Sequence, residues 1–187
     1  DEHDNIIKTD KATYDKLNEL IKTFNKTEIE IGEGYKLVTK NAYYDVTNKM
    51  LSSNEFSTFT DMDKNIVEVN MFNYQIENNL FSSIGKIKIK DSSNNKYFFK
   101  ELHVDTKKEE MIGSDVSVVF DQENFGVSKE SDPRFVANDI FISQNKSNLS
   151  KGVFTVCKKR DDKCPPWSLK AKKISHDKAK KTIYYKH

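Results

Sequence analysis

A repeat of about 30 residues runs along most of this 187-residue chain. Its six units are marked by Tyr14, Tyr44, Tyr74, Val104, Ile142 and His176. The first four markers follow at intervals of 30 residues, and a longer insertion precedes Ile142. Because a period of this length is typical of stacked supersecondary units, the repeat constrains the fold more than any short motif.

Each unit carries apolar side chains at positions i, i+2, i+5 and i+7. Of the 24 such positions, 21 are apolar, although only 36% of the whole chain is hydrophobic. A spacing of two indicates a strand with one buried face, and the step of three shifts that alternation by one residue. A bulge or sharp bend at the step would return both halves to the same face. The two residues inside the step are polar in every unit except at Asn70-Met71.

Polar clusters typical of tight turns follow the bent strands, such as "DVTNK" from Asp45 and "DTKKEE" from Asp105. Returning strands then end at Ile31, Ile89 and Phe120. The pattern predicts an all-β fold, a meander of about a dozen bent antiparallel strands with stacked inner faces. We expect one domain over residues 1–187.

Charge and composition exclude several classes of protein. The 31 basic and 29 acidic residues are nearly balanced, which argues against a nucleic-acid-binding protein. In the lysine-rich C-terminal stretch, Lys170, Lys172 and Lys173 fall on outward or corner positions and are expected to be solvated. The sequence contains no run of 18 or more apolar residues, so it predicts no membrane-spanning helix. The chain begins without Met and stops within the strand-like "TIYYKH", so we expect a fragment of a longer protein.

The sequence predicts no enzyme, no cofactor and no metal centre. Motifs for nucleophile elbows, phosphate loops, dinucleotide binding and zinc peptidases are all absent from it. The four histidines are scattered, and His176 falls on an inward position, where a satisfied core residue is the expectation. Cys157 and Cys164 are either two independent thiols or a local disulfide.

The segment from Phe154 to Tyr185 resembles the end of the periplasmic domain of the LptD family, the lipopolysaccharide-assembly outer-membrane proteins also called organic-solvent-tolerance proteins. The earlier units resemble the looser OstA-type repeat that this family shares with the bridge protein LptA, at Ala12 and Ala42. The elements that carry the resemblance are the cysteine-bearing loop, Pro165-Pro166-Trp167, Lys170-Ala171, Ile174, His176-Asp177, the run from Lys181 to Tyr185, and "SDPRF" from Ser131 to Phe135.

This resemblance implies a β-jellyroll folded like a taco, on the periplasmic face of the Gram-negative outer membrane. It implies reception of lipopolysaccharide from an LptA-like bridge and its passage to the chain's own C-terminal barrel, with an LptE-like plug lipoprotein. Family members use cysteines to join this domain to the barrel, which adds a third expectation for Cys157 and Cys164.

Two sets of residues are expected to carry that function. An inner apolar face would line the path of the acyl chains, and the N-terminal edge strand would add to a strand of the bridge protein. The inner face comprises Leu37, Tyr44, Val69, Phe72, Tyr74, Phe99, Leu102, Phe135, Ile140 and Ile142. The docking edge comprises Ile6, Ile7, Ala12 and Tyr14.

Two alternatives remain open at this stage. One is a free LptA-like periplasmic carrier of lipopolysaccharide. The other is a structural β-repeat that serves as an interaction module and whose interior is filled by its own side chains, because an apolar periodicity does not distinguish a groove from a packed core.

Overall fold

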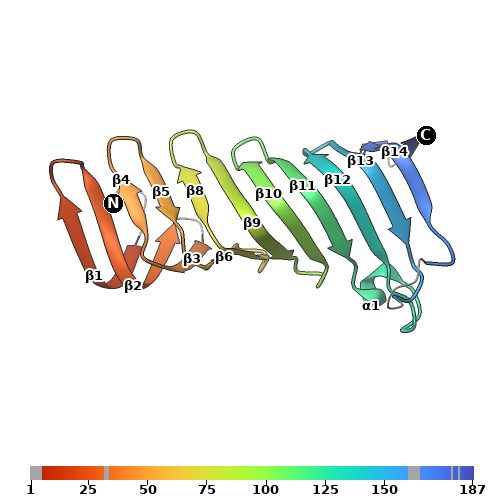
Figure 1. The fold of residues 1–187 in the computed structure, drawn as a ribbon, viewed down its shortest axis with the longest axis horizontal. Helices are drawn as coiled ribbons and strands as arrows, with labels where there is room; N and C mark the ends of the chain where they lie inside the picture. Colours follow the sequence, from red (N-terminus) through yellow and green to blue (C-terminus); the bar gives the residue numbers. More distant parts are fainter. Residues whose placement is uncertain (1–5, 32–33, 160–164, 178, 181) are drawn as a thin grey trace.

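A single antiparallel sheet makes up almost the whole molecule in the computed structural model, which describes residues 6–31, 34–159, 165–177, 179–180 and 182–187. The strands lie side by side along the long axis, from β1 at the N-terminal end to β15 at the other (Figure 1). They are β1 (Ile6–Asp15), β2 (Leu20–Ile31), β3 (Tyr35–Lys40), β4 (Tyr43–Asp45), β5 (Met50–Ser53), β6 (Ser57–Thr60), β7 (Ile66–Val69), β8 (Phe72–Gln75), β9 (Leu80–Lys90), β10 (Lys96–Asp105), β11 (Glu110–Val119), β12 (Arg134–Ile142), β13 (Lys146–Thr155), β14 (Leu169–Asp177) and β15 (Thr182–Lys186).

Six of the short strands form three bent strands, each made of two halves: β3 with β4, β5 with β6, and β7 with β8. Both halves of the first pair with β2, and both halves of the last pair with β9. Between them, β5 pairs with β8 and β6 pairs with β7. Counting β3/β4, β5/β6 and β7/β8 once each leaves twelve strands in the part of the sheet that the structure describes. The all-β meander predicted from the repeat is confirmed.

The bends lie where the sequence predicts them. The register of β1 against β2 shifts between Thr9 and Lys11, and that of β10 against β9 shifts between Phe99 and Glu101. Several residues at the bends adopt left-handed backbone angles. Such a bulge shifts the inward–outward alternation of the side chains by one residue. These residues at the bends are Asn25, Asn41, Gly85, Asp115 and Lys151.

A row of four tight turns closes the hairpins along one side, at residues 16–19, 46–49, 76–79 and 106–109. The last residue of each turn has a positive φ and follows the previous one by 30 residues: Glu19, Lys49, Asn79 and Glu109. Successive turns are joined by equivalent backbone hydrogen bonds of 2.9, 3.0 and 2.9 Å, from Val46 to Glu19, from Ile76 to Lys49 and from Thr106 to Asn79. The repeat in the sequence is therefore a repeat of hydrogen bonds.

The bends divide the sheet into two arms. We call the side that carries these four turns the upper arm, which includes β4, β5 and β8, and the opposite side the lower arm, which includes β3, β6 and β7 (Figure 1). The hydrophobic core lies between the arms and runs from Ile29 to Ile140. The outward lysines Lys170, Lys172 and Lys173 are exposed, as predicted.

The longer insertions lie at the C-terminal end. One contains the helical turn α1 (Gln122–Phe125), which the repeat pattern does not predict. Its Phe125 ring lies 5.1 Å from Phe120 and 5.9 Å from Phe154, and Phe154 in turn lies 6.3 Å from Trp167. This chain of rings joins the two insertions. Within the described ranges, no helix is long and apolar enough to cross a bilayer.

Candidate functional site

The ten side chains predicted for the inner face all lie in the core or pack against it. Six of them are buried: Leu37, Val69, Phe72, Phe99, Leu102 and Ile140. Those nearer the ends of the arms are partly buried: Tyr44, Tyr74, Phe135 and Ile142. All ten side chains therefore face the interior, and their contact with acyl chains stays a prediction.

The interior is closed near the middle of the molecule. Phe59 on the lower arm meets Phe72 and Phe81 on the upper arm edge to face, with ring centroids 4.9 and 5.1 Å apart. Phe72 and Phe81 themselves stack at 6.1 Å. The two arms therefore contact each other directly, and an acyl chain that enters the interior at this point must separate these rings.

Both ends of the interior present apolar side chains to solvent. In β1, Ile7 pairs with Ile29 and Tyr14 pairs with Ile21, which places both on the inner face, yet they are 50% and 52% exposed. In β15, Ile183 pairs with His176 and Tyr185 pairs with Ile174, which places both on the inner face of the upper arm, where they are 49% and 48% exposed. Because β1 pairs only with β2 and β15 only with β14 among the described strands, no neighbouring strand covers them.

The predicted docking edge is thus a true sheet edge, but its residues do not share one face. Ile7 and Tyr14 point inward, whereas Ile6 pairs with the outward Glu30 and lies on the other face. Ala12 is exposed on the inner side of the upper arm. The sequence reasoning placed the opposite edge near Thr182 to Tyr185, as the lead into the barrel, but did not single out Ile183 and Tyr185 as inward residues. Their orientation follows from the pairing of β15 with β14.

A row of buried hydroxyl groups lies beside the bend in the N-terminal strands, and the sequence reasoning also missed it. Thr27 Oγ1 donates to Thr23 Oγ1 at 2.8 Å. Thr39 lies 3.1 Å from Ser53 Oγ and 2.7 Å from Ser57 Oγ. The signal in the sequence was present, because Thr9 and Thr39 are two of the three non-apolar places in the 24-position pattern.

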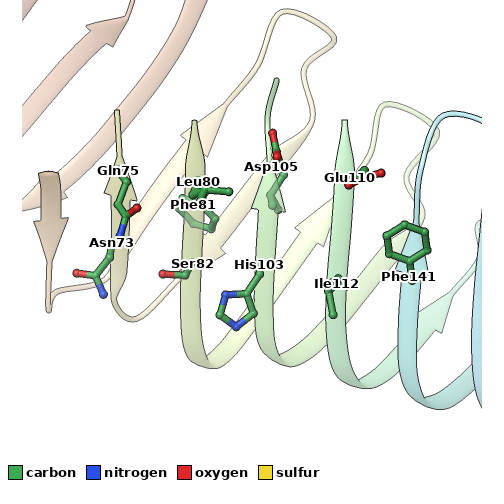
Figure 2. A pocket seen from close by; sticks show the side chains of 11 residues that line it. Asn73, Gln75, Leu80, Phe81, Ser82, His103, Asp105, Glu110, Ile112 and Phe141 are labelled. Atoms are coloured by element: carbon green, nitrogen blue, oxygen red, sulfur yellow. The ribbon is translucent and has the colours of Figure 1, made fainter. Parts of the chain in front are cut away.

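The outer face of the upper arm carries a hollow of about 260 Å³ across β8 to β12 (Figure 2). His103 there lies 2.8 Å from Glu101. Hydrogen bonds from the Lys108 backbone and side chain lower the pKa of Asp105. That carboxylate accepts the backbone N–H groups of Lys107 and Lys108, so it is committed to closing the turn.

Of the two cysteines for which a disulfide is predicted, the structure describes Cys157. The Cys157 backbone N–H donates to Thr155 Oγ1 at 3.1 Å, and the Thr155 hydroxyl donates to Trp167 O at 2.6 Å. Cys164 lies outside the described residues. A bond between Cys157 and Cys164 therefore stays a prediction.

No protein-family model matches the chain, and no curated protein is significantly similar to it in sequence. Among solved structures the chain is similar to LptH of Pseudomonas aeruginosa, with a TM-score of 0.50 and 15% identity, over 59% of this chain and 81% of LptH. The fold is an LptA-type β-jellyroll. LptH is described as the LptA-homologous periplasmic component of the lipopolysaccharide transport device of that bacterium.

Proposed function

We propose that this chain is a non-enzymatic lipopolysaccharide transport domain that holds acyl chains between its two arms. The observation that carries the proposal is the apolar inner face, whose core runs from Ile29 to Ile140 and whose two ends expose Ile7 and Tyr14 in β1 and Ile183 and Tyr185 in β15. Enclosing an acyl chain gains about 0.8 kcal/mol for each buried CH₂ group. The jellyroll shared with LptH supports the same function.

In this proposal the lipid enters at the β1 end from an LptA-like bridge and leaves at the β15 end. The receiver would be the chain's own outer-membrane barrel with its LptE-like plug lipoprotein, at the periplasmic face of the outer membrane. The sequence elements around Pro165-Pro166-Trp167 support this LptD-type role. The likeness to LptH supports a free LptA-like periplasmic carrier equally well.

A photo-crosslinker at Phe72 or Ile140 tests the proposal. The benzophenone amino acid should capture purified lipopolysaccharide at both positions, because both side chains lie between the arms. The matched controls are the next residues along the chain, Asn73 and Phe141, which line the outer hollow (Figure 2). Far-UV circular dichroism of each variant verifies folding. Equal labelling of inner and outer positions, or none, contradicts the proposal.

A filled structural module is the second candidate, and the contact of Phe59 with Phe72 and Phe81 favours it. In such a module the arms would never part. The same crosslinking experiment separates the two, since a permanently filled core captures no lipid at Phe72 or Ile140.

A further inference from the structure

The buried side chains beside the bend change character along the molecule. Between β2 and β6 they are hydroxyl-bearing except at Ala42, and all are at most 6% exposed: Thr23, Thr27, Thr39, Ser53 and Ser57. One repeat later Thr39 is replaced by Val69 and Ser57 by Ile87, and two repeats later Thr39 is replaced by Phe99. Ser83 is the exception, and its hydroxyl donates to the Met71 carbonyl at 2.7 Å.

The hydroxyl groups tie the two arms together at the N-terminal end. Thr23 and Ser53 belong to the upper arm, and Thr27, Thr39 and Ser57 belong to the lower arm. The bonds from Thr27 to Thr23 and from Thr39 to Ser53 therefore cross the bend. An acyl chain inserted there would separate these groups and offer no hydrogen-bonding atom in return, which is unfavourable for buried polar groups.

From β7 onward the bend is held by apolar contacts. Val69, Phe72, Ile87, Phe99 and Leu102 are at most 4% exposed, and their side chains carry no polar atom. An acyl chain that parts the arms here replaces one set of apolar contacts with another. The apolar surface also reaches from the bend to the end of each arm, as in Val67, Val69, Phe72 and Tyr74.

We infer that the acyl chains come to rest only between β7 and β12, and that lipid entering at the β1 end passes the hydroxyl-bonded bend of β2 to β6 without being held there. The inference rests on the proposed function and narrows it. Eight of the ten inner residues keep a lipid-holding role, whereas Leu37 and Tyr44 line the N-terminal part that the lipid only passes. Thr39 is the residue that sets the boundary, because it bonds to both Ser53 and Ser57.

Tyr44 and Tyr74 provide matched reporters, since they occupy the same repeat position, are partly buried and lie outside the hydroxyl row. With benzophenone at either position and purified lipopolysaccharide as the probe, we expect capture at 74 to exceed capture at 44 by about fivefold or more. Thr39→Val should raise capture at 44, and the reciprocal Val69→Thr should lower capture at 74. After Thr39→Val, Ser53 and Ser57 still donate to the carbonyls of Lys40 and Glu55, which keeps the bend satisfied.

The outcomes separate this inference from the proposed function. Equal capture at 44 and 74, or stronger capture at 44, overturns the inference and leaves lipid binding intact. Capture at 74 that is unaffected by Val69→Thr also overturns the role given to the bend residues. Absence of capture at 44, 74, Phe72 and Ile140 overturns both.

Discussion

Individual carboxylates hold the strands and turns of this sheet in register. Hydrogen bonds from Asn18 lower the pKa of Asp15, and those from Asn48 lower the pKa of Asp45 at the equivalent turn. On the outer face of the lower arm, Glu28 lies 2.6 Å from Lys26 Nζ and 3.1 Å from Lys36 Nζ. These two ammonium groups lower the pKa of Glu28 from 4.5 to about 2.

The lowered pKa of Glu28 predicts that the fold loses stability in acid. Because its pKa is lower in the folded state, the ionised carboxylate stabilises the fold above pH 4.5, and that stabilisation is lost as the pH falls from 4.5 towards about 2. Glu28→Gln should reduce the fall in melting temperature over this window. The control is Glu130→Gln, at an exposed turn position. Identical acid profiles for the two variants would contradict the role of Glu28.

The strands need small residues where they bend, and glycine has this role in the C-terminal half. A Cβ atom on Gly113 in β11 would lie 2.6 Å from Phe99 Cδ1, and one on Gly152 in β13 would lie 2.6 Å from Ile174 Cδ1. In the repeat, Gly113 stands where Thr23, Ser53 and Ser83 stand in earlier units. The large Phe99 at the neighbouring inward position leaves no room for those side chains.

Gly113→Ala should therefore lower the free energy of unfolding by about 1–3 kcal/mol through overpacking. Chemical denaturation monitored by circular dichroism measures this loss. Combining it with Phe99→Leu removes the clashing ring and should recover part of the lost stability relative to Phe99→Leu alone. If the double variant shows simple additivity, the Phe99 contact is not the cause.

The whole molecule is a stack of equivalent strands with two open ends, and each end exposes an inner apolar pair. An edge strand with unpaired backbone groups is a template for a partner's strand. Ile7 and Tyr14 at one end and Ile183 and Tyr185 at the other are nearly equal in exposure. In the proposed direction of transport, the β1 end binds the LptA-like bridge protein and the β15 end leads to the outer-membrane barrel.

Charged substitutions at the two ends test that direction. Ile7→Asp with Tyr14→Asp should abolish binding of an LptA-type bridge protein, because the carboxylates would interrupt the apolar face that continues into the partner. Ile183→Asp with Tyr185→Asp is the matched control and should leave bridge binding unchanged. Surface plasmon resonance on the folded variants measures both. Loss of binding in both variants, or only in the β15 variant, contradicts docking at β1.

The sequence alone determined the bent strands and the inward residues, because the step of three in the apolar pattern leaves only one way to keep Val67, Val69, Phe72 and Tyr74 on one face. It also placed the turns, since their polar residues recur every 30 positions. Only the tertiary structure decided that Phe59 closes the interior, that Ile183 and Tyr185 remain uncovered, and that Thr39 bonds across the bend. These features depend on contacts between the two arms and between strands. Residues at the same position of the repeat look equivalent in the sequence. They meet different neighbours along the sheet, so their contacts cannot be read from the period alone.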